Sequence, residues 1–213
     1  MSDSTDPFAT VHRAVGTRQL PSGAAARTVT LRREYPAPVG EVWAACTDAE
    51  RLSRWFLPVT GDLRPGGSYR LEGNAGGRIL ECEPPRLLRV SWIFGEPADE
   101  AEVSEVAVRL TPGGEDRTAL ELEHLATVEP ERWATYGPGA VGVGWDLGLL
   151  GLGRHLRGET ITDPEAWGVS PEARDLMTRS SRAWGEAHRA SGATSDEADT
   201  AMRNTTAFYV PGS

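Results

Sequence analysis

Lysine is absent from this sequence, and basic residues are outnumbered by acidic ones. All 22 basic residues are arginines against 31 acidic residues, which leaves a net charge of -9. Schiff-base chemistry and the phosphate-binding lysine of a P-loop both require lysine, so the sequence excludes them. Nucleic acid and anionic membrane surfaces attract proteins with a basic footprint, so we expect neither as a partner.

Cysteine is also scarce, and no long hydrophobic run is present. Cys46 and Cys82 lie far apart among apolar neighbours, which predicts two buried thiols rather than a disulfide framework or a CxxC motif. The least charged stretch, 137–153, is shorter than the roughly 20 apolar residues of a membrane span, and the N-terminus lacks the apolar core of a signal peptide. We therefore expect a cytoplasmic protein, and without P-loop, dinucleotide, GxSxG or HExxH motifs we expect no cofactor and no metal.

Turn signals divide the middle of the chain into short strands. Alternating apolar residues predict a strand over 28–35, and Gly and Pro pairs at roughly 8–12-residue spacing separate six more. These lie near 58–64, 67–72, 77–83, 87–94, 103–111 and 117–125. Two short helices are expected before this meander, over 39–47 and 49–55, the second capped by Asp48. The acidic run 96–105 predicts a solvated loop over the mouth of a cavity.

A long amphipathic helix is expected over 131–157, with a kink at Gly137-Pro138-Gly139. Its apolar stripe recurs at helical spacing and faces the sheet; the members are Val141, Trp145, Leu149, Leu152 and Leu156. A second stripe consists of Gly144, Gly148 and Gly151. Because glycine costs about 1 kcal/mol relative to alanine inside a helix, these glycines predict either very close packing or a space left empty.

Two segments flank this pattern, which itself covers 27–158. Residues 1–26 are expected to form a flexible arm, with an edge strand allowed over 10–20, and 159–213 a helical extension with helices over 171–190 and 196–205. The first of these helices has an apolar stripe too large to leave exposed, so it covers its own domain or contacts a second copy in a homodimer. Phe208 and Tyr209 are candidates to plug the mouth of the cavity.

The order of strand, two short helices, meander and long helix predicts an α+β helix-grip fold. Further motifs are Pro38, Val42-Trp43, Thr47-Asp48 and Trp55-Phe56, then GDLRPGGSYRL at 61–71, GRILE at 77–81, PPRLLxVSW at 84–92, His124 and Gly144-Trp145. Through these motifs, about 28–157 resembles bacterial SRPBCC proteins of the START-like superfamily, specifically those similar to the C-terminal domain of the activator of heat-shock-protein-90 ATPase. The resemblance implies a carrier of hydrophobic small molecules. It leaves open a polyketide cyclase, dehydratase or hydrolase, and a co-chaperone-like interaction module.

A curved sheet that grips a helix encloses an apolar space, which predicts binding of a hydrophobic or amphipathic small molecule. The candidate ligand-binding residues are Trp55, Phe56, Tyr69, Leu71, Trp92, Phe94, His124, Trp145 and Leu149. The alternative for the aromatic members is that they simply fill the core.

His124 and Asp146 are the candidates for catalysis. A buried imidazole is suited to general acid–base work, and burial beside Arg78 or His124 would raise the pKa of the Asp146 carboxyl. The alternatives are a structural hydrogen-bonding role for His124 and a position of Asp146 facing solvent or a backbone amide near the kink. Catalysis requires that both side chains share one cavity.

Overall fold

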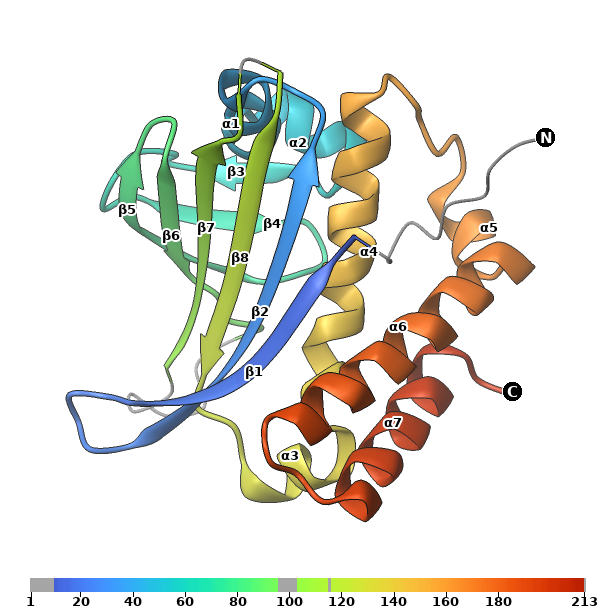
Figure 1. Cartoon of the computed structure of the whole chain (residues 1–213). Coiled ribbons are helices and arrows are strands. Elements are labelled where there is room, and N and C mark those ends of the chain that lie inside the picture. The colour runs from blue at the N-terminus through green and yellow to red at the C-terminus, as the bar shows by residue number, and fades with distance from the viewer. Residues whose placement is uncertain (1–9, 96–102, 115, 213) are drawn as a thin grey trace.

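One antiparallel sheet organises the protein in the computed structural model, which describes residues 10–95, 103–114 and 116–212. Its strands follow the order β1-β2-β8-β7-β6-β5-β4-β3 (Figure 1). Their bounds are β1 His12–Gln19, β2 Ala25–Tyr35, β3 Val59–Gly61, β4 Ser68–Leu71, β5 Gly76–Glu83, β6 Leu87–Ser91, β7 Ser104–Pro112 and β8 Thr118–Ala126. After β2 the chain crosses to the far edge and then returns strand by strand until β8 pairs with β2.

Helices α1 and α2 follow β2, and helices α3 to α7 follow β8. Their bounds are α1 Val39–Thr47, α2 Ala49–Trp55, α3 Pro130–Tyr136, α4 Gly139–Leu156, α5 Pro164–Gly168, α6 Pro171–Ala190 and α7 Ser195–Tyr209. The Asp48 side chain accepts a hydrogen bond from the Arg51 amide at the start of α2, as a helix cap does. At the expected kink the chain forms two helices instead of one, because Gly137 takes a positive φ of 54° between α3 and α4.

The helix α4 lies between the sheet and the C-terminal helices (Figure 1). The strand register places His124 opposite Val106 and Leu122 opposite Leu31. The apolar side chains of neighbouring strands therefore lie on the same face of the sheet. That face turns toward α4, where Tyr35 donates a hydrogen bond to the Leu149 carbonyl (2.8 Å). The protein therefore has the α+β helix-grip fold.

The N-terminal segment forms the edge strand that its sequence allows over 10–20, so from residue 12 onward it is part of the sheet and not a flexible arm. β1 pairs with β2 along its whole length, from His12 opposite Arg32 to Gln19 opposite Ala25. Arg13 on β1 also reaches α4, where its guanidinium donates two hydrogen bonds to a buried carboxylate. The reason for the difference is this long-range side-chain contact, which local sequence does not reveal.

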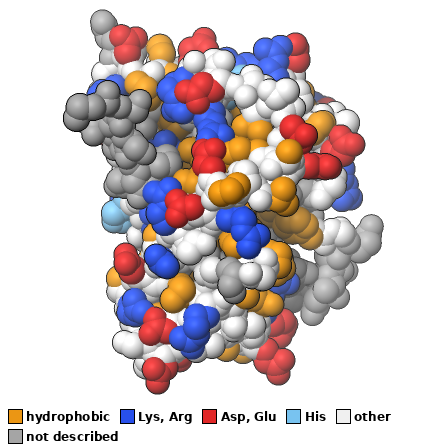
Figure 2. Space-filling view, turned by 90° about the vertical axis from the view of Figure 1, so that its right-hand side faces the viewer, with side chains coloured by type: hydrophobic (Ala, Val, Ile, Leu, Met, Phe, Trp, Pro, Cys, Tyr) orange, Lys and Arg blue, Asp and Glu red, His pale blue; other side chains and the backbone are white. Residues whose placement is uncertain are grey.

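The C-terminal extension packs on the outer side of α4, away from the sheet. On α6 the expected apolar stripe is buried, including Leu176, Met177 and Trp184. A Cβ built on Gly142 of α4 would lie only 2.2 Å from the Trp184 ring, so this glycine makes room for the indole. The stripe thus covers its own domain, which removes the reason to expect a homodimer through it. Figure 2 faces this side and shows charges of both signs scattered among hydrophobic side chains.

Two further expectations concern the mouth of the cavity. The Tyr209 hydroxyl donates to the Ala140 carbonyl (3.0 Å), and Phe208 is exposed, so this pair packs beside the first turn of α4 and does not plug the cavity. Residues 96–102 of the predicted acidic loop lie outside the described residues. None of the described helices combines the length and apolar content needed to cross a membrane.

Candidate functional site: an apolar cavity between the sheet and α4

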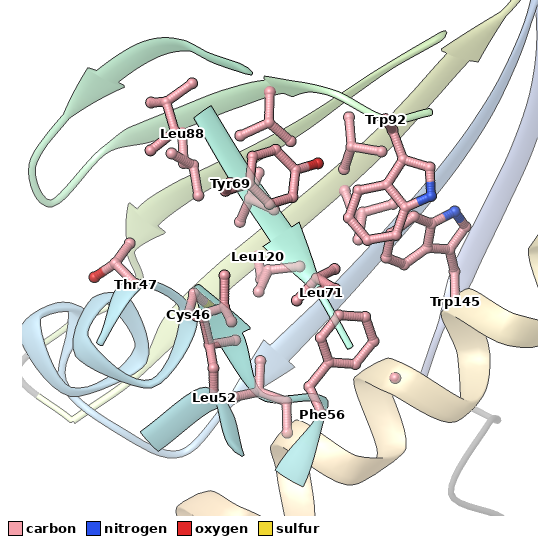
Figure 3. Close-up of a pocket in the computed structure, with 18 of the residues that line it drawn as sticks. Cys46, Thr47, Leu52, Phe56, Tyr69, Leu71, Leu88, Trp92, Leu120 and Trp145 are labelled. Carbon is pink, nitrogen blue, oxygen red and sulfur yellow. The ribbon is translucent and has the colours of Figure 1, made fainter. Parts of the chain in front are cut away.

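A cavity of about 180 Å³ lies between the inner face of the sheet, the pair α1–α2 and α4 (Figure 3). Its walls are almost entirely apolar. The lining residues are Cys46, Thr47, Leu52, Trp55, Phe56, Val59, Leu63, Tyr69, Leu71, Ile79, Cys82, Leu88, Val90, Trp92, Val106, Val108, Leu120, Leu122, Trp145, Gly148, Leu149 and Leu152. Leu63, in the loop between β3 and β4, both lines the cavity and is exposed, so the cavity reaches the surface there.

The structure brings most of the predicted ligand-binding side chains to this cavity. Seven of them line it: Trp55, Phe56, Tyr69, Leu71, Trp92, Trp145 and Leu149. Phe94, the eighth aromatic or aliphatic candidate, does not line it. The regular strand β6 ends at Ser91, which breaks the alternation, and the Phe94 side chain is 64% exposed. His124 is buried but lies behind the wall rather than in it.

Aromatic rings form a continuous corner at one end of the cavity. The ring centroids of Trp92 and Trp145 are 4.9 Å apart, and Phe56 and Tyr69 lie 6.4 and 6.5 Å from Trp92. All these pairs are tilted, a geometry that the ring quadrupoles favour. The opposite end is aliphatic and thiol-bearing: in Figure 3, Cys46 and Leu88 lie away from the two indoles. The site therefore has an aromatic end and an aliphatic end.

The few polar atoms of the lining make hydrogen bonds within the protein. Thr47 Oγ1 donates to the Trp43 carbonyl (2.8 Å), and the Tyr69 hydroxyl donates to the Ser91 carbonyl (2.7 Å). Trp55 Nε1 donates to the Ala45 carbonyl (3.0 Å). Desolvation raises the pKa of the Tyr69 hydroxyl, which therefore stays protonated. These groups are anchors of the wall and present little polarity to an occupant.

His124 holds one of the indoles in place. An indole N–H can only donate, so Trp145 Nε1 donates to His124 Nδ1 (3.1 Å), and the imidazole proton sits on Nε2. Nε2 then donates to Ser104 Oγ (2.9 Å). Burial lowers the pKa of His124 to about 4, because the charged form would lose its hydration. His124 is thus a neutral structural bridge from β8 to the cavity wall on α4.

Asp146 follows Trp145 in the sequence but faces the other side of α4. Its carboxylate is fully buried and accepts two hydrogen bonds from the Arg13 guanidinium, at 3.0 and 2.9 Å. It also accepts from Ser180 Oγ (2.5 Å) and Trp184 Nε1 (3.0 Å) on α6. A buried carboxylate with a counter-charge and additional donors is a structural junction, and here it joins β1, α4 and α6.

The structure does not bring the two catalytic candidates together. His124 bonds Ser104 and Trp145 on the sheet side of α4, whereas Asp146 bonds partners on its outer side. Arg78, the other partner considered for Asp146, donates instead to the Gly66 carbonyl (2.6 Å). Neither His124 nor Asp146 lines the cavity, so the requirement of a shared cavity is not met. This pair therefore carries no acid–base mechanism on an occupant.

Sequence reasoning missed the aliphatic, thiol and glycine part of the lining. Leu88 and Leu120 lie on the predicted strands 87–94 and 117–125, where alternation with lining residues two positions away, Val90 and Leu122, is the signal that identifies them. Cys46 and Cys82 are predicted as buried thiols; in the structure both are half-buried, and they line the cavity from α1 and β5. Burial raises the pKa of the Cys46 thiol to about 12, which leaves it protonated and a weak nucleophile.

The glycine stripe of α4 has more than one cause. Gly148 lines the cavity, and a Cβ built on it would meet only Phe56, at 3.9 Å. Gly151 packs closely, because its Cβ would lie 3.0 Å from the Trp55 carbonyl oxygen. Gly144 is exposed on the flank of the helix. Both explanations predicted for this stripe therefore apply, at different turns of one helix: close packing at Gly151 and a space left empty at Gly148.

Keeping the cavity empty is unfavourable for folding. At roughly 24 cal/mol per Å³, a hollow of about 180 Å³ forgoes on the order of 4 kcal/mol of packing. A side chain at Gly148 would fill part of this space at no steric cost. A hollow that could be filled so simply is consistent with a site that a guest molecule occupies.

A curved antiparallel sheet gripping one helix over an apolar hollow defines a helix-grip protein of the SRPBCC type. Within that class, the chain belongs to the family described as activator of Hsp90 ATPase homolog 1-like protein, whose model matches residues 36–156. The matched segment runs from the end of β2 to the end of α4. β1, β2 and α5–α7 lie outside it.

Several solved structures resemble this chain. CalU16 from Micromonospora echinospora is 41% identical, with a TM-score of 0.66 for its crystal structure, and the match covers 84% of this chain and 98% of CalU16. DynU16, described as a putative protein in the dynemicin biosynthetic locus, is 26% identical with a TM-score of 0.53, covering 62% of this chain and 48% of DynU16. A protein from Bordetella parapertussis is 27% identical with a TM-score of 0.51, and the match covers 71% of this chain and 85% of the Bordetella protein. A comparison with curated proteins found no match.

The match to CalU16 is longer than the family segment. It covers 84% of the 213 residues, whereas the family model matches only 36–156. The similarity therefore includes at least part of the flanking segments, which contribute Arg13, Ser180 and Trp184 to the Asp146 junction.

Proposed function

We propose that this protein binds a hydrophobic or amphipathic small molecule in the cavity between its sheet and α4. The observation that carries the proposal is the cavity itself: about 180 Å³, walled by apolar side chains and open beside Leu63. Ligand sites are concave and mostly apolar, and burial of apolar surface supplies most of their affinity. The setting of DynU16 in the dynemicin biosynthetic locus supports a role connected with small molecules.

Binding is favoured over catalysis by the composition of the wall. Among the described residues, no Asp, Glu, His or Arg side chain lines the cavity. General acid–base catalysis needs a titratable group within hydrogen-bond reach of the substrate. The titratable side chains that do line the cavity are poor candidates: Tyr69 donates its proton to the Ser91 carbonyl, and burial raises the pKa of the thiols of Cys46 and Cys82. We therefore do not propose a cyclase, dehydratase or hydrolase, and the covered stripe of α6 gives no reason to propose an interaction with a second copy.

The proposal is tested with an uncharged dye and two matched variants of α4. N-phenyl-1-naphthylamine fluoresces when it leaves water, and excitation of Trp92 and Trp145 allows energy transfer to a dye bound beside them. Gly148→Leu projects a side chain into the cavity, whereas Gly144→Leu adds the same side chain at an exposed position of the same helix. We expect saturable binding by the wild type and Gly144→Leu, and an affinity about 10-fold or more lower for Gly148→Leu, a change of at least ~1.4 kcal/mol.

Equal dye affinity in the two variants would show that the dye binds outside the cavity, and the proposal would fail. Circular dichroism and urea denaturation of both variants check that the comparison concerns folded proteins. Filling the hollow is expected to leave Gly148→Leu at least as stable as Gly144→Leu.

A further inference from the structure

The charged side chains that alternate with lining residues on β6 and β8 lie on the outer face of the sheet. On β6, Arg89 lies between two lining residues, and strand alternation sends it to the opposite face of the sheet. There it forms ion pairs with Glu81 and Glu105 of the neighbouring strands, at 3.3 and 3.0 Å. Glu121, between the lining residues Leu120 and Leu122, pairs with arginines on the same outer face. The arginine of the inner face, Arg33 opposite Leu120, is not part of the lining: its guanidinium donates to the Leu149 carbonyl (3.3 Å) and lies over the Tyr35 ring. Among the described residues, no charged side chain lines the cavity.

Hydrogen-bond donors are equally unavailable to an occupant. The hydroxyl protons of Thr47 and Tyr69, and the indole protons of Trp55 and Trp145, are all used within the protein. Trp92 Nε1 makes no hydrogen bond within the described residues, but Figure 3 shows it on the side of the indole pair away from Leu71 and Leu120. An ion or a strongly polar group in the cavity would therefore lose its hydration without replacement.

The aromatic corner offers ring surface but no cage. Cation-binding cages set several rings around an open space within about 6 Å of the cation. Here the rings of Phe56, Tyr69, Trp92 and Trp145 pack on one another, with neighbouring centroids 4.9 to 6.5 Å apart. They present one continuous wall of ring edges and faces, which suits an aromatic ring in a tilted or offset contact.

The size of the cavity suits a compact ring system. Apolar protein cavities of roughly 150 Å³ stay dry and bind benzene, so about 180 Å³ with an opening at Leu63 accommodates a small aromatic group whose substituents extend outward. A charged group of an amphipathic ligand must then be carried on a chain long enough to reach the opening, because a charge bonded directly to the ring system would be enclosed with the ring between the apolar walls.

We infer that the ligand is uncharged wherever the cavity encloses it, and that an aromatic group faces Trp92 and Trp145. This inference rests on the proposed function and narrows it, because it excludes molecules whose carboxylate or ammonium group must enter the cavity.

The test uses three probes with the same ring system: methyl 2-naphthoate, 2-naphthoate and 2-naphthyltrimethylammonium. Each competes with N-phenyl-1-naphthylamine on the wild-type protein near neutral pH. Placing a charge on the naphthalene core costs its hydration, so the anion and the cation should both bind on the order of 100-fold or more weakly than the ester. Naphthoate binding should strengthen as the pH falls toward its own pKa, because the neutral acid then becomes available.

The outcomes separate this inference from the proposed function. An anion or a cation that competes within tenfold of the ester overturns the inference, while Gly148-dependent dye binding leaves the proposed function standing. Failure of the ester to compete with a dye that does bind in the cavity also overturns the inference. If the dye binds Gly148→Leu as tightly as the control variant, the proposed function itself fails, and the inference fails with it.

A separate experiment tests whether an aromatic group faces Trp92 and Trp145. It compares methyl 2-naphthoate with a saturated analogue, the methyl ester of decalin-2-carboxylic acid. Ring–ring contacts add about 0.5–1.5 kcal/mol beyond burial, so methyl 2-naphthoate should bind about 2- to 10-fold more tightly than the decalin ester. Trp92→Leu should abolish this preference while both esters still bind. Equal affinities of the two esters for the wild type would contradict an aromatic group at this end.

Discussion

The two sides of α4 are packed in opposite ways, one densely around a buried charge and the other loosely around a cavity. On the outer side, Asp146 is fully buried, its carboxylate is bonded to Arg13, Ser180 and Trp184, and a glycine admits an indole ring. On the inner side, Trp145 and Gly148 border a hollow of about 180 Å³. The outer side encloses charge in dense packing, and the inner side encloses empty space without charge.

This difference indicates how the cavity is maintained. A helix beside a hollow lacks packing on that side and would tend to move inward. Contacts outside the cavity hold α4 instead: the Asp146 junction on one side, and the bonds of Trp145 to His124 and of Tyr35 to the Leu149 carbonyl on the other. The densely packed side stabilises the position from which the open side can receive a guest.

The largest effect is expected from breaking the outer junction. Asp146→Ala removes the buried acceptor shared by Arg13, Ser180 and Trp184, so the free energy of unfolding should fall by roughly 3–5 kcal/mol. Urea denaturation measures this loss. Glu123→Ala is the matched control, because it removes a carboxylate paired with the half-exposed Arg18 and should cost about 1 kcal/mol or less. Similar losses for both variants would mean that the junction is no more important than a surface ion pair.

A smaller, pH-dependent effect on stability is expected from His124, which bridges β8 and α4. The pKa of His124 is lowered to about 4, so its contribution to stability is complete above the unfolded pKa of about 6.5 and declines as the pH falls toward the folded value. Relative to His124→Gln, the wild type should lose about 2 kcal/mol between about pH 7 and about pH 4.5. Urea denaturation at both pH values measures this difference, in which the carboxyl groups common to both proteins cancel. Parallel pH profiles would contradict a buried, neutral imidazole.

The same substitution should have opposite signs on the two sides of the helix. Gly142→Ala places a Cβ 2.2 Å from the Trp184 ring, and overpacking of this kind typically costs 1–3 kcal/mol, so roughly that loss of stability is expected. Gly148→Ala meets no atom closer than 3.9 Å and should gain up to about 1 kcal/mol from helix propensity. Thermal denaturation of the pair ranks them directly. A destabilising Gly148→Ala would mean that the inner side is not open.

Much of the fold and of the inner side could be predicted because its signals are local. The bounds of α1 and α2 follow from apolar spacing and from the Asp48 cap. The lining follows from alternation along strands such as β8, where Leu120 and Leu122 share a face. Phe94 shows the limit of this reasoning, since alternation continues in the sequence after the strand has ended at Ser91.

The outer side could not be predicted, since its partners are brought together only by the complete fold. Arg13 lies 133 residues from Asp146, and Trp184 lies 38 residues away on the other flank. Nothing near Arg13 distinguishes it from the other arginines of the sequence. Which arginine reaches the carboxylate depends on β1 adding to the sheet edge and on α6 crossing α4, both of which are tertiary events.

The chain also contains its own chemical reporter of the cavity. Cys46 and Cys82 are the two cysteines of the sequence, and both line the hollow, from α1 and β5. Both thiols are half-buried and their pKa values are raised, so they react slowly with a small uncharged alkylating reagent, and an occupant that covers them should slow the reaction further. Mass spectrometry of the alkylated protein then records directly whether the hollow is vacant or filled.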